Sequence, residues 1–436
     1  MKDASLIQTI ILVVLGFVIV IAVLIFSGIL PGFGSKMGRG TTTKVVAWGT
    51  LSSEVMRPVI DKINSQNKDT FVVEYVGRSP DNFRAELVDA IALGVGPDLI
   101  LAPSDIALAE ANKLFVTPFE TLSRREYLTN FTDMAEVYLS PSGFIGLPIL
   151  IDPLVMYYNR DLYTTAGIVE VPTNWSAMLG VSQTLTKKDN QNIISQSGLA
   201  MGEASNIKNM TAVLGTLILQ AGNPIVTRNA EGYNVVLNSR SGESSASQAA
   251  FNFFSSFSNS SNQNYSWNEI MDQDQAEFVN GRLANYFGYA SELAQIRQKN
   301  PNLNFALDVI PQRDAEARKT THGRVFGVSI LKSAKDVNAA FGVAWLLAGA
   351  EYSQAFSTLL NTPPARSALL ASPDRADPMS EVFYLSAIYS RTWPNVDADQ
   401  TDEIFKRAVR AYNNSSSNVS GNIIRTANDQ LIQLYR

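Results

Sequence analysis

The chain has 436 residues and a net charge of −5, with 46% hydrophobic and 17% charged residues, which suits two or three domains with sizeable cores. Lysine and arginine are scattered along it, so no basic face indicates a nucleic-acid partner. There is no cysteine and one histidine, His322, which excludes disulfides, thiol catalysis and a structural zinc site.

An almost unbroken apolar run extends from Ile10 to Leu30. As a helix, this run would span roughly 30 Å, the thickness of the hydrocarbon core of a bilayer. It is longer than the apolar region of most secretory signals, and no clear A-x-A cleavage pattern follows it. We therefore predict a short segment at 1–9, an uncleaved transmembrane anchor at 10–30 and a flexible Gly/Ser/Thr-rich linker at 31–43. A cleaved signal is the alternative, and the flanking basic residues do not decide the orientation.

Strand and helix patterns alternate after the linker. Buried strands are predicted at 44–48, 71–76 and 98–102, each followed by apolar residues at helical spacing, the last of them over 106–115. This alternation predicts a parallel α/β sheet with helices on both faces.

A second α/β region follows, and the C-terminal part is mainly helical. The polar stretch 259–268 is predicted to be a loop, and the stretch SPDRADP at 372–378 is predicted to be a boundary. Further strands are predicted at 154–158, 284–288, 305–310 and 325–331.

A carboxylate, Asp152, lies in the middle of the largely apolar stretch LPILIDPLVMYYNRDLY at 147–163. An ionised carboxylate in a core costs several kcal/mol unless a partner compensates it. The stretch therefore raises the question of what Asp152 faces.

Four stretches resemble one known family when their order and spacing are taken together. They are GVGPDLILAPSDIALAEANKLFVTPF (94–119), GFIGLPILIDPLVMYYNRDLYTTAGIVEVPTNW (143–175), FVNGRLANYFGYASE (278–292) and, more weakly, 333–370. Over about residues 44–435 the chain resembles the extracellular solute-binding proteins of ABC importers, in the maltose-binding-like group called family 1.

The resemblance implies an α/β, two-lobed, periplasmic-binding-protein-like fold with a ligand cleft between the lobes. One lobe would comprise 44–150 plus 323–372, and the other 151–322 plus 373–436. Asp152 aligns with a carboxylate at the crossing between lobes, which faces the sugar in maltose-binding relatives. A structural hydrogen bond at the hinge is the alternative role for Asp152.

Sugar binding needs carboxylates and amides for hydroxyl groups and aromatic rings for the apolar C–H faces. In the first lobe the candidates are Trp48 at the end of the first strand, Ser53 or its neighbour Ser52, Arg78 after the second strand, and Asp105 after the third. The alternatives are that Trp48 packs under the first helix, and that the serines and Asp105 cap helices.

In the second lobe the candidates are Glu203 and Asn206 in the stretch MGEASN, Trp267 in the polar loop, and Tyr289. The alternatives are a turn with a helix cap for the first two and a lid over an aromatic helix for Trp267.

Two further candidates come late in the chain. Trp393, in SRTWPNVD, falls where relatives place a tryptophan in the cleft. Arg366, in TPPAR, is a candidate cleft residue with a structural role as the alternative.

The sequence contains no G-x-S-x-G, P-loop or H-E-x-x-H motif. The stretch DADQTDE at 397–403 lacks the glycine and the terminal glutamate of a calcium loop, and a solvated helix N-terminus explains it better. We therefore predict that the protein is not an enzyme and uses no metal or cofactor.

The resemblance implies a monomeric receptor that captures a solute, foremost a sugar or oligosaccharide, and delivers it to the permease subunits of an ABC importer. With the predicted anchor, the protein would be a single-pass protein of the cell membrane with its binding domain outside. The alternatives are a surface sensor or adhesin with the same fold, and a receptor for a non-sugar solute such as a polyamine. For a polyamine, Asp105, Asp152 and Glu203 would supply the carboxylates.

Overall fold

The computed structural model describes residues 42–229, 232–239, 245–313, 318–371, 377–415 and 420–435. The chain divides at Thr43 into two units, and the fold given below is that of Lys44–Arg436. The predicted segment 1–9, the anchor 10–30 and nearly all of the linker lie outside the described residues. Within those residues, no helix has both the length and the apolar character needed to cross a bilayer.

Fifteen strands lie in the described ranges. They are β1 (Thr43–Gly49), β2 (Phe71–Gly77), β3 (Leu99–Pro103), β4 (Thr117–Pro118), β5 (Leu139–Ser140), β6 (Gly143–Phe144), β7 (Leu147–Asn159), β8 (Lys187–Lys188), β9 (Ile194–Leu199), β10 (Val226–Asn229), β11 (Gly232–Val235), β12 (Leu283–Tyr289), β13 (Phe305–Asp308), β14 (Thr321–Ile330) and β15 (Ser390–Arg391).

The α-helices follow the same chain order. They are α2 (Ser53–Asn67), α3 (Phe83–Ala92), α4 (Ser104–Ala109), α5 (Arg124–Asn130), α6 (Arg160–Thr165), α7 (Trp175–Leu185), α8 (Met210–Gln220), α9 (Ala246–Ser255), α10 (Asp274–Val279), α11 (Leu293–Lys299), α12 (Val337–Leu347), α13 (Ala350–Leu360), α14 (Ser367–Leu370), α15 (Pro378–Tyr389), α16 (Ala398–Asn413) and α17 (Ser420–Leu434). Short 3-10 helices are formed by Ala111–Lys113, Asp133–Tyr138 and Ala290–Glu292.

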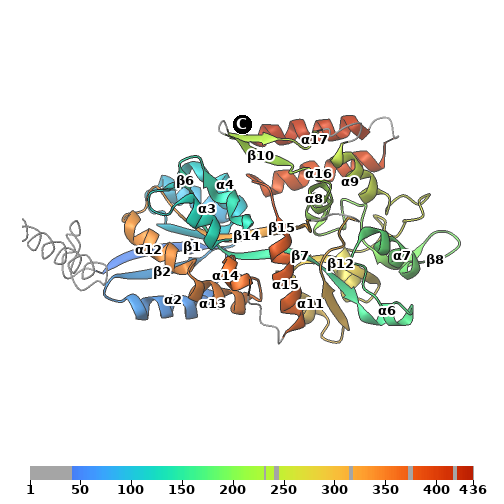
Figure 1. The fold of residues 1–436 in the computed structure, drawn as a ribbon, viewed down its shortest axis with the longest axis horizontal. Coiled ribbons are helices and arrows are strands. Elements are labelled where there is room, and N and C mark those ends of the chain that lie inside the picture. The colour runs from blue at the N-terminus through green and yellow to red at the C-terminus, as the bar shows by residue number, and fades with distance from the viewer. Residues whose placement is uncertain are drawn as a thin grey trace, which may run out of the picture. The chain divides into compact units, whose positions relative to one another are not determined.

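One ten-stranded sheet runs through both lobes in the order β2-β1-β3-β14-β7-β12-β9-β8, with β13 added to β7 and β15 to β14. Strands β7 and β14 lie between the two groups of helices in Figure 1. In β7 every residue is buried except Asp152 and Tyr158. The stretch is apolar on both faces because helices cover both sides of the sheet.

The predicted strands are confirmed, but the prediction of a parallel sheet is correct only in part. Strands β1 and β3 pair in parallel, as do β9 and β12. Strand β14 is antiparallel to both β3 and β7, and β12 is antiparallel to β7. The reason is that β7 and β14 carry the chain between the lobes in opposite directions, which forces them to pair antiparallel.

Two further predictions concern local structure. The predicted helix 106–115 is shorter, because α4 ends at Ala109 and a separate 3-10 turn follows at Ala111–Lys113. The loop at 259–268 is confirmed. The predicted boundary at 372–378 falls mostly on residues outside the described ranges.

Each lobe encloses its own apolar core. In the second lobe, residues from the C-terminal half of β7 pack with α8, α9 and α16, as Tyr157, Leu214 and Phe405 illustrate. In the first lobe, β1 and β3 pack with α2 and α12, as Leu101 and Val343 illustrate. Each such side chain contributes about 1.5–3 kcal/mol when fully buried, so each lobe has its own source of stability.

The crossing strands leave no room for a side chain at Gly327 in β14. A Cβ atom there would lie 2.5 Å from Tyr138 Oη and 2.8 Å from the backbone oxygen of Leu147. Gly327→Ala is therefore expected to lower the free energy of unfolding by about 1–3 kcal/mol, measured by urea denaturation. Gly342 in α12 is the control, because a Cβ atom there meets nothing within 4 Å. Gly342→Ala should be neutral or stabilise by up to about 1 kcal/mol, and equal losses in both variants would contradict the crowding argument.

Candidate functional site

A cavity of about 740 Å³ lies between the lobes, over the crossing strands. Thr50 follows β1, and Asp105 follows β3, at the carboxyl ends of two parallel strands where open α/β sheets bind ligands. The floor is formed by the middle of β7 and β14, and the second lobe contributes the segment before α8 and the end of β12. The segment 392–402 closes a further side.

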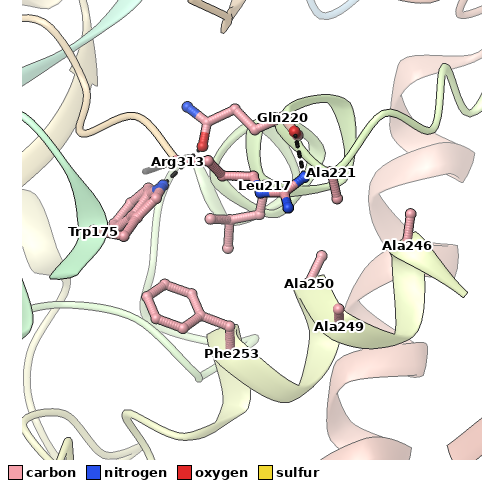
Figure 2. Close-up of a pocket in the computed structure, with 9 residues that line it drawn as sticks. All are labelled: Trp175, Leu217, Gln220, Ala221, Ala246, Ala249, Ala250, Phe253 and Arg313. Atoms are coloured by element: carbon pink, nitrogen blue, oxygen red, sulfur yellow. Dashed lines mark hydrogen bonds between the residues drawn. The ribbon is translucent and has the colours of Figure 1, made fainter. Parts of the chain in front are cut away.

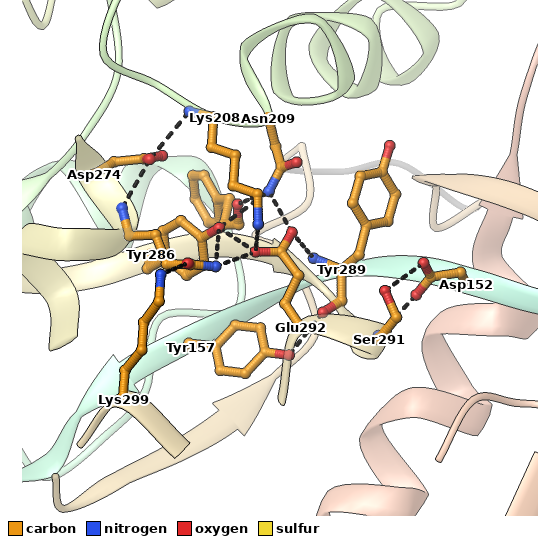
Figure 3. Close-up of polar contacts among 12 residues, drawn as sticks. Asp152, Tyr157, Lys208, Asn209, Asp274, Tyr286, Tyr289, Ser291, Glu292 and Lys299 are labelled. Atoms are coloured by element: carbon orange, nitrogen blue, oxygen red, sulfur yellow. Dashed lines mark hydrogen bonds and ion pairs between the residues drawn. The ribbon is translucent and has the colours of Figure 1, made fainter. Parts of the chain in front are cut away.

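Asp152 faces protein partners at the floor of this cavity. Its Oδ1 accepts a hydrogen bond from the backbone N–H of Ser291 at 2.9 Å, and its Oδ2 accepts from Ser291 Oγ at 2.8 Å (Figure 3). Arg324, its neighbour across the β7–β14 pairing, donates from Nη2 to the same Oδ2 at 2.5 Å. Both oxygens are thus paired, which offsets the cost of placing a carboxylate in an apolar strand.

Arg324 in turn covers an aromatic ring. Its guanidinium lies 3.7 Å from the centre of the Tyr289 ring, although half of the arginine side chain remains accessible. Partial removal of the guanidinium from water lowers the pKa of Arg324, but the charge of Asp152 outweighs this effect and raises that pKa above its ordinary value. The floor therefore presents a fixed guanidinium whose charge is compensated.

Three rings pack beside this ion pair in edge-on and tilted contacts. Tyr289 Oη lies 3.0 Å from His322 Nδ1, and the His322 ring lies 5.1 Å from that of Trp393. Burial, with a smaller effect of the Arg324 charge, lowers the pKa of His322 to about 3, so the imidazole is neutral around pH 7. Trp393 is only 3% exposed, and its ring fits over Gly215, where a Cβ atom would meet it at 2.9 Å. Trp393 thus forms wall rather than an open stacking face.

Asp105 lies in the first turn of α4, while the N-cap position is taken by Pro103. Burial raises the pKa of Asp105, and backbone hydrogen bonds and the Arg324 charge offset this only partly. No ion pair to Asp105 occurs within the described part of the chain. Of the eleven candidates predicted from the sequence, four line the cavity, namely Asp105, Asp152, Tyr289 and Trp393.

Three first-lobe candidates do not line the cavity. The guanidinium of Arg78 covers the Trp48 ring at 4.2 Å, and Trp48 is 8% exposed. Arg78 also pairs with Glu86 at 3.3 Å. Ser53 Oγ accepts a hydrogen bond from the backbone N–H of Gly77, while Ser52 caps α2. These side chains connect β1, β2 and α2, and Thr50 and Leu51 reach the cavity in their place.

The predictions for Trp267 and Asn206 are corrected by their burial. Trp267 is fully buried, and its Nε1 donates to Asn206 Oδ1 at 2.9 Å. Asn206 Nδ2 donates to the backbone oxygens of Asn268 and Met271. Because these polar groups are used within the protein, the two residues fasten the loop at 259–268 to the lobe and leave no surface for a ligand.

Arg366 and Glu203 also lie away from the cavity. Arg366 donates to the backbone oxygen of Ala348 at 2.6 Å and to Asn130 Oδ1 at 3.1 Å, which corrects its predicted place in the cleft to a structural one. Glu203 is half-buried, and burial followed by the charge of Glu269 raises its pKa to about 7. It is absent from the lining of the cavity.

Several cavity residues were missed from the sequence. Arg324 carried a signal like that of Asp152, a single charge in a strand whose other residues are uncharged and mostly buried. Lys208 and Asn209 come one residue after the stretch MGEASN, which ends at Asn206. Asp402 accepts a hydrogen bond from Thr211 Oγ1 at 2.6 Å, which joins α16 to α8. Sequence periodicity has no means of showing such pairings between distant segments.

A second pocket, of about 440 Å³, lies in the second lobe between α8 and α9 (Figure 2). Its lining is mainly apolar, with alanines of α9 opposite Leu217. Trp175 Nε1 donates to Gln220 Oε1 at 2.7 Å, so these polar groups satisfy each other. The interlobe cavity, which lies at the carboxyl ends of β1 and β3 and over the crossing strands, is the candidate site. Within the described ranges, no group of three metal-ligating side chains could hold an ion.

The sequence matches the bacterial extracellular solute-binding protein family over residues 59–379. It is also 30% identical over 97 residues to binding proteins of Brucella abortus and Brucella suis. That segment covers 21% of this chain and 23% of those relatives, so the chain matches less than a quarter of their length. The expected resemblance to extracellular solute-binding proteins is confirmed, and the matched family is one of binding proteins rather than enzymes.

Solved structures show the same fold at low sequence identity. A cyclo/maltodextrin-binding protein complexed with maltotetraose has a TM-score of 0.73 at 16% identity, over 90% of this chain and 98% of that one. The cyclic α-maltosyl-1,6-maltose binding protein of Arthrobacter globiformis has a TM-score of 0.73 at 15% identity, over 90% and 99%. The maltose/maltodextrin-binding domain of Bdellovibrio bacteriovorus, bound to maltotriose, has a TM-score of 0.64 at 16% identity, over 90% and 100%.

The lowered pKa of His322 predicts a pH dependence of stability. Between its ordinary value of 6.5 and its folded value of about 3, the unfolded chain binds a proton that the folded protein does not. The free energy of unfolding should therefore fall as the pH is lowered through this window, by up to about 1.4 kcal/mol per pH unit from this group.

His322→Gln removes that contribution, so the stability difference between the parent and the variant should shrink as the pH falls from about 7 to about 4. Chemical denaturation at a series of pH values measures it. Asp274, whose pKa is raised to about 7 by burial, titrates in the opposite sense in both proteins and cancels from the difference. Parallel curves for the two proteins would show that His322 is not held neutral.

Proposed function

Because the chain belongs to the family of bacterial extracellular solute-binding proteins, we propose that it is a receptor for a sugar or oligosaccharide, which it delivers to an ABC import permease. The binding site is the interlobe cavity. The observation that carries the proposal is the composition of its lining, in which fixed hydrogen-bonding groups lie beside the aromatic residues Tyr289 and Trp393.

The cavity offers several groups that suit hydroxyl recognition. Asp105 and Thr50 face it from the first lobe, and Lys208 and Asn209 face it from the second. Arg324 lies on the floor with its direction fixed by Asp152. Carboxylate, amide and ammonium groups in fixed directions orient a polyol. The similar structures described as bound to maltotetraose and maltotriose support a saccharide as the ligand class.

The crossing strands give a mechanism for capture. Strands β7 and β14 connect the lobes, so bending there brings Asp105 and Thr50 toward Lys208 and Asn209 around the ligand. In this proposal the lobes are 44–150 plus 323–372 and 151–322 plus 373–436. Closure fixes the relative position of exposed faces on the two lobes, and a permease then recognises the combined surface.

The proposal retains an anchor at 10–30, with the linker 31–43 holding the binding domain outside the cell membrane. It takes Asp105, Asp152, Tyr289 and Trp393 as site residues, together with Thr50, Lys208, Asn209 and Arg324.

A polyamine or other cationic solute is the second candidate. The observation in its favour is that Asp105 and Asp399 line the cavity, and that no ion pair to either occurs within the described ranges. The weight of aromatic and neutral hydrogen-bonding groups in the lining favours the saccharide.

Thermal unfolding in the presence of mono- and oligosaccharides, polyamines and amino acids tests the proposal. A ligand at 100 times its Kd stabilises a protein by roughly 2.7 kcal/mol, and we expect an oligosaccharide to raise Tm accordingly. Asp152→Asn should lower the affinity for that ligand by about 10–100-fold, because the substitution releases Arg324 from its fixed direction.

Glu351→Gln provides the control, since Glu351 pairs with Lys62 on an exposed surface away from the cavity. This variant should bind like the parent. A response to polyamines alone would replace the saccharide by a cationic solute, and no response to any compound would remove the proposal of a soluble-ligand receptor for these classes.

A further inference from the structure

Glu292 lies directly behind the second-lobe wall of the cavity (Figure 3) and is 7% exposed. Its two carboxylate oxygens accept five hydrogen bonds, which come from Asn209 Nδ2 (2.8 Å), the Tyr289 backbone N–H (3.1 Å), Lys208 Nζ (2.9 Å), Gln275 Nε2 (2.6 Å) and Tyr286 Oη (2.5 Å). Two of these donors, Lys208 and Asn209, belong to residues that line the cavity.

The directions of these hydrogen bonds are fixed by chemistry. Lys299 Nζ donates to Gln275 Oε1 at 2.7 Å, which turns the Gln275 amide donor toward Glu292. The Tyr289 backbone N–H and the Lys208 ammonium have no acceptor capacity. Burial raises the pKa of Glu292, but the Lys208 charge and the hydrogen bonds from Tyr286, Lys208 and Asn209 outweigh this and hold that pKa below its ordinary value. Glu292 is therefore a carboxylate.

This arrangement determines which atoms the wall offers to a ligand. Asn209 Nδ2 is taken up by Glu292, the Phe287 backbone oxygen and Tyr286 Oη, which leaves Asn209 Oδ1 as the acceptor. Lys208 uses one of its three N–H groups on Glu292, and its side chain is 42% exposed. Lys208 thus offers N–H donors and the adjacent Asn209 offers a carbonyl acceptor, a combination that suits neighbouring sugar hydroxyls.

The charges that line the cavity are unevenly compensated. Both cations in the lining are paired with carboxylates of the protein, Arg324 with Asp152 and Lys208 with Glu292. Of the four carboxylates in the lining, Asp152 and Asp402 are also paired, the latter with Lys406 at 2.7 Å. Asp105 and Asp399 have no ion pair within the described residues. The cavity therefore carries an excess of negative charge, which disfavours an anion.

We propose that Glu292 sets the charge specificity of the cleft: by compensating Lys208 from behind, it makes the second-lobe wall a neutral surface for hydroxyl groups, so the cleft accepts neutral saccharides and rejects acidic ones. Glu292 acts here as a positioning residue, because it does not line the cavity itself. This inference rests on the proposed function for its ligand class, while the role of Glu292 toward Lys208 is testable without any sugar.

Glu292→Gln is the informative substitution because it keeps the size of the side chain and removes its charge. An amide NH₂ group in place of Oε1 would meet the Tyr289 backbone N–H, which has no freedom to turn. The NH₂ group must then take the place of Oε2 and meet the Lys208 ammonium. Two donors repel each other, so the ammonium is released toward the cavity with its charge uncompensated.

Sulfate is the probe that needs no cognate sugar. At constant ionic strength made up with chloride, sulfate should raise the Tm of Glu292→Gln by more than it raises the Tm of the parent. The double variant Glu292→Gln/Lys208→Met should lose this gain, because the gain depends on the released ammonium. A merely structural role of Glu292 would lower Tm in both variants without any response to sulfate that depends on Lys208, and that result would overturn the proposal.

Matched saccharides test the specificity itself. In titration calorimetry the parent should bind maltotriose, or another neutral oligosaccharide that raises its Tm, at least about tenfold more tightly than an acidic counterpart such as trigalacturonate. Glu292→Gln should reduce or reverse this preference. Glu277→Gln is the control, because Glu277 is a buried glutamate of the same lobe that pairs with Arg282 at 2.6 Å away from the cavity. This control should retain the preference of the parent.

The outcomes separate the two proposals. If the parent binds the acidic saccharide as tightly as the neutral one, the charge specificity is wrong and the receptor function stands. If no saccharide binds while sulfate distinguishes Glu292→Gln from the double variant, the sugar function fails and the role of Glu292 stands. If Glu292→Gln does not fold, the comparison of the parent with Lys208→Met decides: both should respond equally to sulfate because Glu292 already compensates the Lys208 charge, and a sulfate response of the parent that Lys208→Met abolishes would overturn the proposal.

Discussion

The ion pair between Asp152 and Arg324 is the interaction on which the site depends. Both residues lie in strands that cross between the lobes, directly opposite each other in the β7–β14 pairing. A carboxylate in this largely buried strand is stable there because Arg324 and Ser291 occupy both of its oxygens. The same contact fixes the floor of the cavity and ties the turn after β12 to the crossing. The strands that connect the lobes also form the floor of the cavity, so in the proposed closure a ligand on the floor contacts the strands that bend.

Around that pair, the cations and the histidine of the cavity are held in fixed states by their neighbours. His322 remains neutral between Tyr289 and Trp393, Arg324 is compensated by Asp152, and Lys208 by Glu292. Polar groups held in fixed directions lose little entropy when a ligand binds. Glu292 compensates and orients Lys208 in the second-lobe wall, as Asp152 compensates and orients Arg324 in the floor.

The sequence predicted the elements far better than it predicted the site. Strands β1, β2 and β3 followed from apolar runs at regular spacing. Asp152 was noticeable as a charge within the later apolar run that forms β7. Its partners lie 139 and 172 residues away, at separations where no pattern in one sequence identifies a contact.

Trp267 illustrates the opposite error: a tryptophan in a polar loop suggested a surface platform, yet burial decides its role, and that depends on the packing of the whole lobe. Lys208 and Glu292 were overlooked because charged residues are common at helix ends, and only the fold shows that one of them is buried.

The order of strands in the sheet also bears on how the protein is made. Strand β14 lies between β3 and β7, so the hydrogen-bonding edge of β3 has no final neighbour until a strand about 220 residues later has been synthesised. At 5–20 residues per second, that edge waits for roughly 10–45 s. An apolar strand with an open edge readily pairs with other chains. The nascent protein thus spends about half of its synthesis time with this strand edge open to other chains, and delayed folding or a chaperone on that edge would limit such pairing.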